Sequence, residues 1–419
     1  MRLGIMVLGA VCTAALYAGV RITAPENGET LPQLWPEEIA FLEMPREQRR
    51  TFREKGDRAA VKALKARKKS ARPVVISWSG AEGPCTVKVE RLPDGKIFHE
   101  ATATGTSVAI TGRLEIARSW KATVSDGASS ATVTFATEDR APRIITMEGV
   151  TNVRDLGGRI GLGGRRVKQG LVLRSSGLNT NARVPRYTYD EVLKLHEEGR
   201  LATAGAWNSR DLGRQYESML KKGKPIDPKT MRLYKYDPPT PGQDRVSAAD
   251  KIAFLKFFGI KNDIDFREDW ECFGMTGSPL GGDVCWHHYP MYSAYGGIRT
   301  PKGRATIALA FNVFRSEKNF PLLFHCIGGT DRTGTFAFLL NALLGVDEEE
   351  LVRDYEMSFL SNAGMDELHA KWLDGLIKAV HEMPGDTLAD KAKGYFMSLG
   401  FSEEAVEQVR EFLLEPAAR

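Results

Sequence analysis

The sequence predicts a multidomain chain in which a small antiparallel β-sandwich is followed by an α/β domain whose central sheet is flanked by helices. Its 419 residues are enough for two or three domains with cores of their own. Residues 71–139 contain short alternating or β-branched runs separated by Gly, Pro, Asp and Ser, which is typical of antiparallel strands. Over residues 144–415, helical and strand-like segments alternate, as in a sheet covered by helices.

The N-terminus has the pattern of an export signal. Met1 and Arg2 are followed by an apolar run from Leu3 to Val20. This pattern predicts a signal peptide over residues 1–24, and therefore an exported protein that is periplasmic, secreted or anchored outside the cytoplasm. An uncleaved anchor is the alternative, and we expect membrane contact in that case alone.

Two segments separate this leader from the α/β domain. Residues 25–70 are charged and favour helix, so we expect a solvated helical spacer there. Residues 71–139 carry Trp78 on an early strand and Trp120 on a later one, and they resemble a fibronectin type III or related immunoglobulin-like module. Such a module implies a partner at a cell surface or on another protein.

Composition and cysteine usage narrow the classes of function. A formal charge of +5 over 419 residues is modest, and no basic groove with interleaved aromatic residues stands out, so we expect no nucleic-acid partner. The cysteines and histidines show no spacing typical of zinc, and we expect no metal. In an exported chain, Cys272 and Cys285 either form a disulfide or stay as two buried thiols.

The most informative segment is LLFHCIGGTDRTG at residues 322–334. An apolar run typical of a buried strand leads into a glycine-rich loop, and a buried helix is predicted over residues 333–344. A loop between a strand and a helix N-terminus aims several backbone N–H groups at one point, with the helix dipole behind them. This arrangement predicts a cradle for a phosphate dianion.

Cys326 and Arg332 are the reactive pair of this loop. Gly328 and Gly329 let the backbone adopt positive φ and approach an anion closely. Arg332 can hold two phosphate oxygens, and the field of the loop should stabilise Cys326 as a thiolate nucleophile. The alternative for Cys326 is a structural cysteine in an α/β core. His325 either orients the loop or is a buried core histidine.

Four ordered segments then resemble a known family. HCIGGTDRTG at 325–334 is similar to the signature of cysteine-dependent protein-tyrosine phosphatases. Three further segments resemble the atypical bacterial members of that family. They are NVRDLGG at 152–158 with the following RSS, GIKNDIDFR at 259–267, and RDYE at 353–356. The resemblance covers about residues 145–362 and implies a phosphoric monoester hydrolase that needs no cofactor.

The resemblance assigns roles to individual residues. Cys326 would attack phosphorus to form a phosphocysteine, while Arg332 and the loop amides would hold the phosphate oxygens. Asp331 would be the general acid, with Asp265 and Asp283 as weaker candidates. The implied substrate-binding residues are His325, Ile327, Gly328, Gly329, Thr330, Thr333, Gly334, Asn152, Arg154 and Asp155.

Several of these roles have structural alternatives. Asp331 could instead form a salt bridge with Arg332 that braces the loop. Asn152, Arg154 and Asp155 either lie near the mouth of the site or form a turn that braces the signature loop. For Asp265 a structural role at the end of a strand is favoured. Thr333 is expected to donate its hydroxyl to the Cys326 sulfur.

An insertion is predicted over about residues 181–249, between the RSS segment and the IDFR strand. We interpret it as a helical lid or substrate-recognition element. Its aromatic residues either clasp a phosphotyrosine ring or pack against one another; they are Tyr187, Tyr189, Trp207, Tyr216, Tyr234 and Tyr236.

The sequence therefore predicts an exported phosphatase acting on phosphotyrosine proteins or small aryl phosphate esters. An inositol phosphate or phosphoinositide phosphatase with the same chemistry is the first alternative. Family members that accept such lipids often carry Lys where this chain has Thr330, which makes that substrate less favourable. The second alternative is a non-catalytic surface protein that binds a phosphorylated ligand. A rhodanese-like sulfur carrier fits the segments at 152–158 and 265–267 poorly.

Overall fold

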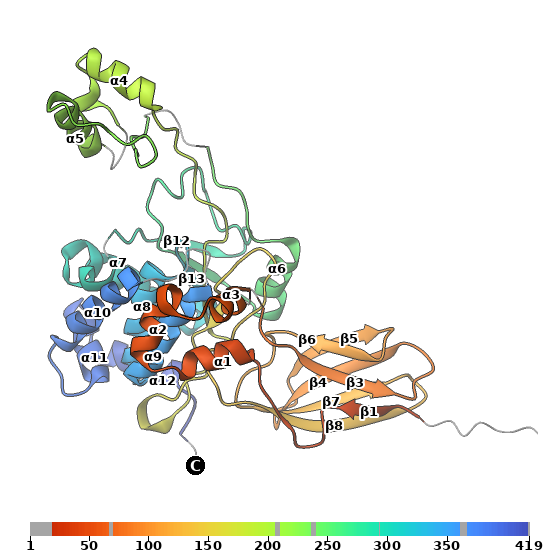
Figure 1. The fold of residues 1–419 in the computed structure, drawn as a ribbon. Coiled ribbons are helices and arrows are strands. Elements are labelled where there is room, and N and C mark those ends of the chain that lie inside the picture. Colours follow the sequence, from red (N-terminus) through yellow and green to blue (C-terminus); the bar gives the residue numbers. More distant parts are fainter. Residues whose placement is uncertain are drawn as a thin grey trace, which may run out of the picture. The chain divides into compact units, whose positions relative to one another are not determined.

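The computed structural model describes residues 19–66, 70–205, 210–235, 240–292, 294–360 and 367–417. The chain divides into two compact units, and the larger one is discontinuous in sequence. The smaller unit comprises the chain up to Gln33 together with residues 72–139, and the larger comprises residues 34–71 and 140–419. Figure 1 shows the elements of both units.

The smaller unit consists of two sheets. One has the order β1-β3-β6 and the other β2-β8-β7-β4-β5, and only the β2–β8 pair of these pairings is parallel. Along β3 and β4, buried residues alternate with more exposed ones, as the strand period requires. The strands are β1 (Arg21–Ala24), β2 (Thr30–Leu31), β3 (Val74–Ser79), β4 (Cys85–Leu92), β5 (Ile97–Ala103), β6 (Ser107–Ile110), β7 (Ser119–Ser125) and β8 (Ser130–Thr137).

Strand β1 overlaps the last residues of the segment predicted as a leader. Residues 1–18 lie outside the described part of the chain, but residues 21–24 pair with β3, and Ile22 lies opposite Trp78. These residues therefore belong to the folded unit, because they satisfy backbone groups at the edge of its three-stranded sheet. Within the described residues, no helix has the length and apolar character needed to cross a membrane.

The segment predicted as a spacer forms three helices, but they do not behave as a solvated linker. Phe41 and Phe52 are buried and form an aromatic trio with Phe359, with ring centroids 5.3–5.9 Å apart. Arg49 is 2% exposed and contacts the carboxylates of Glu349 and Glu356. The helices are α1 (Pro36–Glu43), α2 (Arg46–Lys55) and α3 (Arg58–Ala66), and all three belong to the larger unit.

The larger unit is built on a five-stranded sheet with the order β12-β11-β13-β10-β9. The first four strands run parallel, and β9 is an antiparallel edge. The carboxyl ends of β10, β11, β12 and β13 therefore share one edge of the sheet. The strands are β9 (Arg154–Asp155), β10 (Val172–Ser175), β11 (Asn262–Asp265), β12 (Cys285–His288) and β13 (Leu322–His325).

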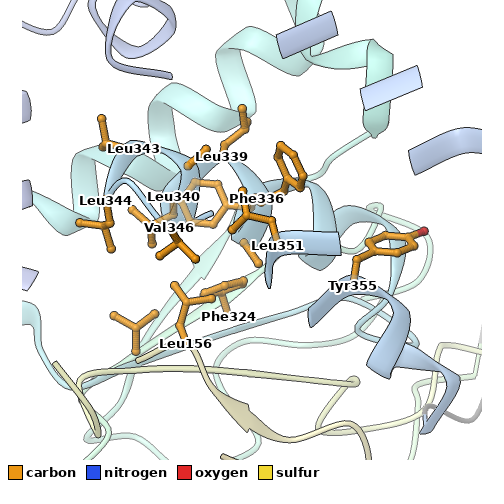
Figure 2. Packing of buried hydrophobic residues seen from close by; sticks show 14 of the residues in the cluster. Leu156, Phe324, Phe336, Leu339, Leu340, Leu343, Leu344, Val346, Leu351 and Tyr355 are labelled. Atoms are coloured by element: carbon orange, nitrogen blue, oxygen red, sulfur yellow. The ribbon is translucent and has the colours of Figure 1, made fainter. Parts of the chain in front are cut away.

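Side chains of β13 alternate between two hydrophobic cores. Leu322 and Phe324 join the larger core, while Leu323 joins the core that includes Phe254 and Phe258. Helix α8 packs on the larger-core face, and Figure 2 shows its leucines and Phe336 packed against Phe324 and Leu351. The helices are α6 (Ala248–Ile252), a π-helical continuation at Ala253–Phe257, α7 (Pro301–Phe314), α8 (Asp331–Leu343), α9 (Glu348–Glu356), α10 (Glu367–His381), α11 (Leu388–Ser398) and α12 (Glu403–Leu413). Short 3₁₀ segments are η1 (Leu162–Gly164), η5 (Tyr295–Arg299), η6 (Glu317–Asn319) and η7 (Met357–Leu360).

The predicted insertion forms a small helical element with its own core. It contains α4 (Tyr189–Glu197), η2 (Leu201–Thr203) and α5 (Arg210–Lys221). Backbone bridges at its base join residues 179 to 244 and 183 to 240. Tyr187, Tyr189 and Tyr216 pack with the insertion's apolar residues, which favours packing over substrate contact for these rings. Trp207 and Tyr236 lie outside the described residues.

Candidate active site

The glycine-rich loop connects β13 to α8 at the edge where the parallel strands end. The strand ends at His325, and the helix begins at Asp331. Gly329 has φ +70°, and a Cβ there would lie 2.5 Å from the carbonyl oxygen of Ser175 on β10. Gly328, which was also expected to need a positive φ, does not have one. The close approach of loop and strand β10 thus depends on Gly329.

Three successive carbonyls of the loop accept hydrogen bonds from outside it. The backbone N–H of Gly177 donates to Ile327 O at 3.0 Å, and Asn152 Nδ2 donates to Gly328 O at 3.0 Å. Arg174 Nη2 donates to Gly329 O at 2.6 Å. In a trans peptide the N–H points opposite to the carbonyl. The N–H groups that follow these carbonyls are therefore turned toward the inside of the loop, where an anion would sit.

A buried ionic cluster anchors this arrangement from behind. Asp354 on α9 contacts Arg159 at 2.8 Å, Arg154 at 3.3 Å and Arg174 at 2.5 Å. Burial alone would raise the pKa of the Asp354 carboxyl, but the three guanidinium groups hold it well below its usual range. Arg154 also contacts the Asn152 side-chain oxygen, so two of the donors to the loop are oriented by one carboxylate.

The opening motif braces the loop and does not line its mouth. Asn152, Arg154 and Asp155 are all buried, and Asn152 adopts a left-handed φ of +59°. Asn152 donates to the loop and Arg154 holds Asn152, whereas Asp155 forms an ion pair with Arg143 at 3.0 Å and accepts the backbone N–H of Gly157. The geometry therefore favours the structural alternative for all three residues.

Arg332 is held by a residue that the sequence did not reveal. Its guanidinium forms two hydrogen bonds with Glu271, at 2.6 and 3.3 Å, and donates to Phe266 O at 3.3 Å. Burial lowers the pKa of Arg332, but the charges of Cys326 and Glu271 raise it above its usual value. Glu271 lies six residues after Asp265 on the loop that follows β11, so the parallel strand order was the signal that could have located it.

Asp331 lies at the first position of α8 with a partly exposed carboxylate. The hydroxyl of Tyr295 donates to its Oδ1, and His369 Nε2 lies 3.6 Å from the same oxygen. The alternative salt bridge with Arg332 does not form in the described contacts, because Arg332 turns to Glu271 instead.

The two weaker general-acid candidates are placed elsewhere. Asp265 is fully buried, forms hydrogen bonds with Arg267 at 2.6–3.1 Å and faces His325. Burial would raise the pKa of Asp265, but His325 and Arg267 lower it strongly. Asp283 precedes β12, and because β12 runs parallel to β13, it lies at the opposite edge of the sheet from Cys326.

His325 is a buried histidine between two carboxylates. Its Nε2 lies 3.0 Å from Asp263 Oδ1, and its Nδ1 lies 3.7 Å from Asp265 Oδ1 and 3.3 Å from the carbonyl oxygen of Cys326. Burial lowers the pKa of His325, but the two carboxylates outweigh burial and raise it above its usual value. These contacts place the His325 imidazole behind the loop, away from its concave side.

The remaining loop residues are largely buried. Thr330 is 1% exposed, and a Cβ at Gly334 would meet the Tyr355 ring at 2.8 Å. Cys326 itself is 2% exposed at the floor of the loop. The expected hydrogen bond from Thr333 to the Cys326 sulfur is not formed, since the buried Thr333 Oγ1 has no hydrogen-bond partner among the described residues.

Cys272 and Cys285 are both free thiols, so no disulfide joins them. Cys272 follows the carboxyl end of β11, whereas Cys285 begins β12, and these positions lie at opposite edges of the parallel sheet. The buried Cys272 sulfur lies 3.4 Å from Asp265 Oδ2. Burial and this carboxylate raise the pKa of the Cys272 thiol far above its usual value, which makes it unreactive.

Comparison with known proteins places this site in a family. The sequence matches the model of the tyrosine phosphatase family over residues 145–186 and 201–415, more than half of the chain. The chain belongs to the tyrosine phosphatase family. The unmatched stretch between the two ranges holds α4 of the insertion.

Two curated relatives are similar over parts of the sequence. A tyrosine-protein phosphatase of Nostoc commune is 29% identical over 126 residues, which cover 24% of this chain and 41% of that protein. A protein of Cupriavidus necator, provisionally named a tyrosine-protein phosphatase, is 26% identical over 237 residues, covering 55% of this chain and 69% of the relative. The chain therefore spans less than half the length of the Nostoc relative.

Proposed function

We propose that this protein hydrolyses phosphotyrosine or a similar aryl phosphate monoester through a phosphocysteine intermediate. One observation carries the proposal: three consecutive loop carbonyls accept hydrogen bonds from outside the loop, so the N–H groups that follow them face the inside of the loop that begins at Cys326. Inward N–H groups at a helix N-terminus suit a phosphoryl group whose negative charge must be held during transfer. Membership of the tyrosine phosphatase family supports this chemistry.

The reaction proceeds in two displacements. The Cys326 thiolate attacks phosphorus, the bond from phosphorus to the phenolic oxygen breaks, and Asp331 gives its proton to that oxygen. A water molecule then loses a proton to Asp331 and attacks the phosphocysteine, which releases phosphate and the thiolate. Arg332 holds the phosphoryl oxygens in both steps, and it must turn from Glu271 toward the substrate when phosphate binds.

A substrate with one phosphate suits the charges around the loop. Three arginines of the larger unit are already engaged by buried carboxylates, Arg154 and Arg174 by Asp354 and Arg267 by Asp265. Thr330 occupies the loop position before Asp331 and contributes no cation. This distribution favours an aryl monophosphate over an inositol phosphate that carries several phosphate groups.

The test is hydrolysis of phosphotyrosine peptide and inositol phosphates by the wild type and two variants. Cys326→Ser should abolish hydrolysis while keeping the fold, as judged by circular dichroism, and EDTA should not inhibit the wild type. Asp331→Asn should slow phosphotyrosine hydrolysis by about 10²–10⁴-fold, the usual contribution of a general acid. Full activity of Cys326→Ser would contradict the proposal, and faster turnover of inositol phosphates would favour the lipid-type substrate.

We also propose that the protein acts outside the cytoplasm, on the basis of the apolar run from Leu3 to Val20. Strand β1 supports removal of the leader before Arg21, because a later cut would delete a paired strand. The N-terminal sequence of the protein recovered from the periplasm or medium tests this. Recovery from the cytoplasm with Met1 retained would contradict it.

A further inference from the structure

We propose that Tyr295 is a positioning residue that holds the Asp331 carboxylate in place for proton transfer. This inference rests on the proposed function, in which Asp331 protonates the leaving group. The hydroxyl of Tyr295 contacts Asp331 Oδ1, and it lies 2.5 Å from the hydroxyl of Tyr355. Tyr295 comes from η5 and Tyr355 from α9, so two separate elements converge on the first residue of α8.

The backbone at Tyr295 is strained in a way that serves this contact. Its φ is +54°, a left-handed conformation that a residue with a large side chain adopts only when its surroundings hold it there. Its N–H donates to Thr335 Oγ1 at 2.9 Å, and the Thr335 hydroxyl donates to the carbonyl of Asp331 at 2.9 Å. Both ends of Tyr295 are therefore fixed to the first turn of α8, which supports the strained conformation.

The donor and acceptor roles of the two phenol hydroxyls follow from their partners. A carboxylate only accepts, so Tyr295 must donate to Asp331, and Tyr355 then donates to Tyr295. Burial raises the pKa of Tyr295 and of Tyr355, and the neighbouring Asp331 carboxylate raises both further. Both phenols therefore stay protonated over the working pH range. Among the described residues, Tyr295 and His369 both approach Oδ1 of Asp331, which leaves Oδ2 of that carboxylate to protonate the leaving group.

His369 and Trp372 on α10 complete the surroundings of Asp331. His369 Nε2 lies 3.6 Å from Oδ1, and its ring packs against Trp372 with centroids 5.2 Å apart. Trp372 also packs against Tyr295 at 5.6 Å and is 41% exposed. The titratable groups that face Asp331 from the elements packed against it are thus Tyr295, Tyr355 and His369. The charges of Arg174 and Cys326 also influence the pKa of Tyr355.

Tyr295→Phe tests the proposal, because it keeps the ring and removes the donor. A general acid matters for a poor leaving group and little for a good one. We expect the kcat for phenyl phosphate to fall about 10-fold, the cost of one hydrogen bond to a charged group, with little change for 2,4-dinitrophenyl phosphate. The alkaline limb of the pH–rate profile should move to higher pH, since a donor to a carboxylate favours its ionised form.

Tyr395→Phe is the matched control. The Tyr395 hydroxyl donates to Ile298 O at 2.8 Å, so this variant also removes a buried phenol that holds η5, without touching Asp331. It should keep the wild-type pH profile and the wild-type ratio of the two substrates. In an Asp331→Asn background, Tyr295→Phe should cause no further loss, because the two residues act as one unit.

Two outcomes would overturn the role of Tyr295. Equal losses for both substrates with an unchanged pH profile would show a merely structural residue, and wild-type rates would show no role at all. If Tyr295→Phe fails to fold, Tyr355→Phe replaces it, because it removes the hydroxyl that donates to the Tyr295 oxygen, and a smaller loss that is again selective for phenyl phosphate is expected. A wild type without Cys326-dependent hydrolysis of either ester would overturn the proposed function, and the Tyr295 role with it.

Discussion

Individual residues around the loop act mainly by holding one another. Asp354 contacts Arg154, Arg159 and Arg174. Arg174 donates to the loop itself, and Arg154 is linked to it through Asn152. The sequence marked Arg154 and Asp354 through their motifs, but local patterns do not show which charges meet across about 200 residues. Glu271 was missed for the same reason. An isolated buried charge is costly, so this cluster is a constraint on the fold as much as on catalysis.

His325 should make stability depend on pH in a defined direction. Its pKa in the folded protein is raised by Asp263 and Asp265, against burial, above the unfolded value of about 6.5. Its stabilisation is therefore complete below about pH 6.5 and is lost as pH rises through the folded-state value. We expect the free energy of unfolding of the wild type to decline above about pH 6.5.

Urea unfolding at several pH values from 6 to 9 measures this decline. His325→Asn lacks the titrating imidazole, so its free energy of unfolding should be lower at pH 6 and should decline less toward pH 9 than that of the wild type. The exposed histidine of α10 provides a control, and His381→Asn should follow the wild-type curve. Parallel declines in His325→Asn and the wild type would contradict the assignment.

At the scale of elements, strand direction decides which residues can meet. The strand near residue 322 was predicted from its apolar pattern and the strand near residue 262 from the family resemblance, and the structure contains both. Strand β11 pairs in parallel with both β12 and β13, which places Asp283 and Cys285 at the edge of the sheet away from Cys326. That pairing is a long-range property, because it depends on the order of strands that are not neighbours in sequence. Local patterns therefore could not exclude Asp283 as a general acid or a disulfide between Cys272 and Cys285.

The signature loop gives a sharp prediction through Gly329. Gly329→Ala introduces a Cβ 2.5 Å from Ser175 O at a φ of +70°, so it combines left-handed strain of about 1–2 kcal/mol with a backbone clash. The loop must shift away from β10, and a displacement near 1 Å at a reacting centre costs about 10²-fold in rate. We expect such a loss in kcat/KM, together with a lower Tm.

Gly164→Ala is the control that introduces left-handed backbone strain without a steric clash. Gly164 has φ +71°, and a Cβ there meets nothing within 4 Å. This variant should lower the free energy of unfolding by about 1 kcal/mol and leave activity intact. Equal loss of activity in the two variants would mean that the contact between the loop and β10 does not matter.

At the scale of the whole molecule, the discontinuity of the larger unit was beyond local patterns. Residues 36–66 contain many charges and few large apolar residues, so a spacer was the natural prediction. The partner of Phe41 and Phe52 is Phe359, which lies far along the chain. The two-sheet unit, the alternation of the α/β part and the insertion were all visible as patterns. The packing of α1–α3 within the larger unit was not visible as a local pattern.

Two truncations should separate the roles of these segments. Ala71 N–H donates to Thr146 Oγ1 at 2.9 Å, so a chain that begins at residue 34 and joins residues 71 and 140 by a short Gly/Ser linker lacks the smaller unit and keeps the larger one. This shortened chain should fold and keep its kcat/KM. A chain that begins at residue 140 loses Phe41 and Phe52, each worth about 3–5 kcal/mol as a buried aromatic side chain, and should be largely unfolded. Thermal melts and activity measure both, and an inactive linker variant would contradict the prediction that the larger unit folds and acts without the smaller one.

The contact between Phe52 and Phe359 has a consequence for biosynthesis. About 300 residues separate the two rings, so the first leaves the ribosome about 15–60 s before the second at typical elongation rates. During that interval the apolar faces of α1 and α2 have no docking site, whereas translation of the two-sheet unit is complete once β8 ends at Thr137. Newborn chains should therefore recruit chaperones at residues 36–66 until translation reaches α9.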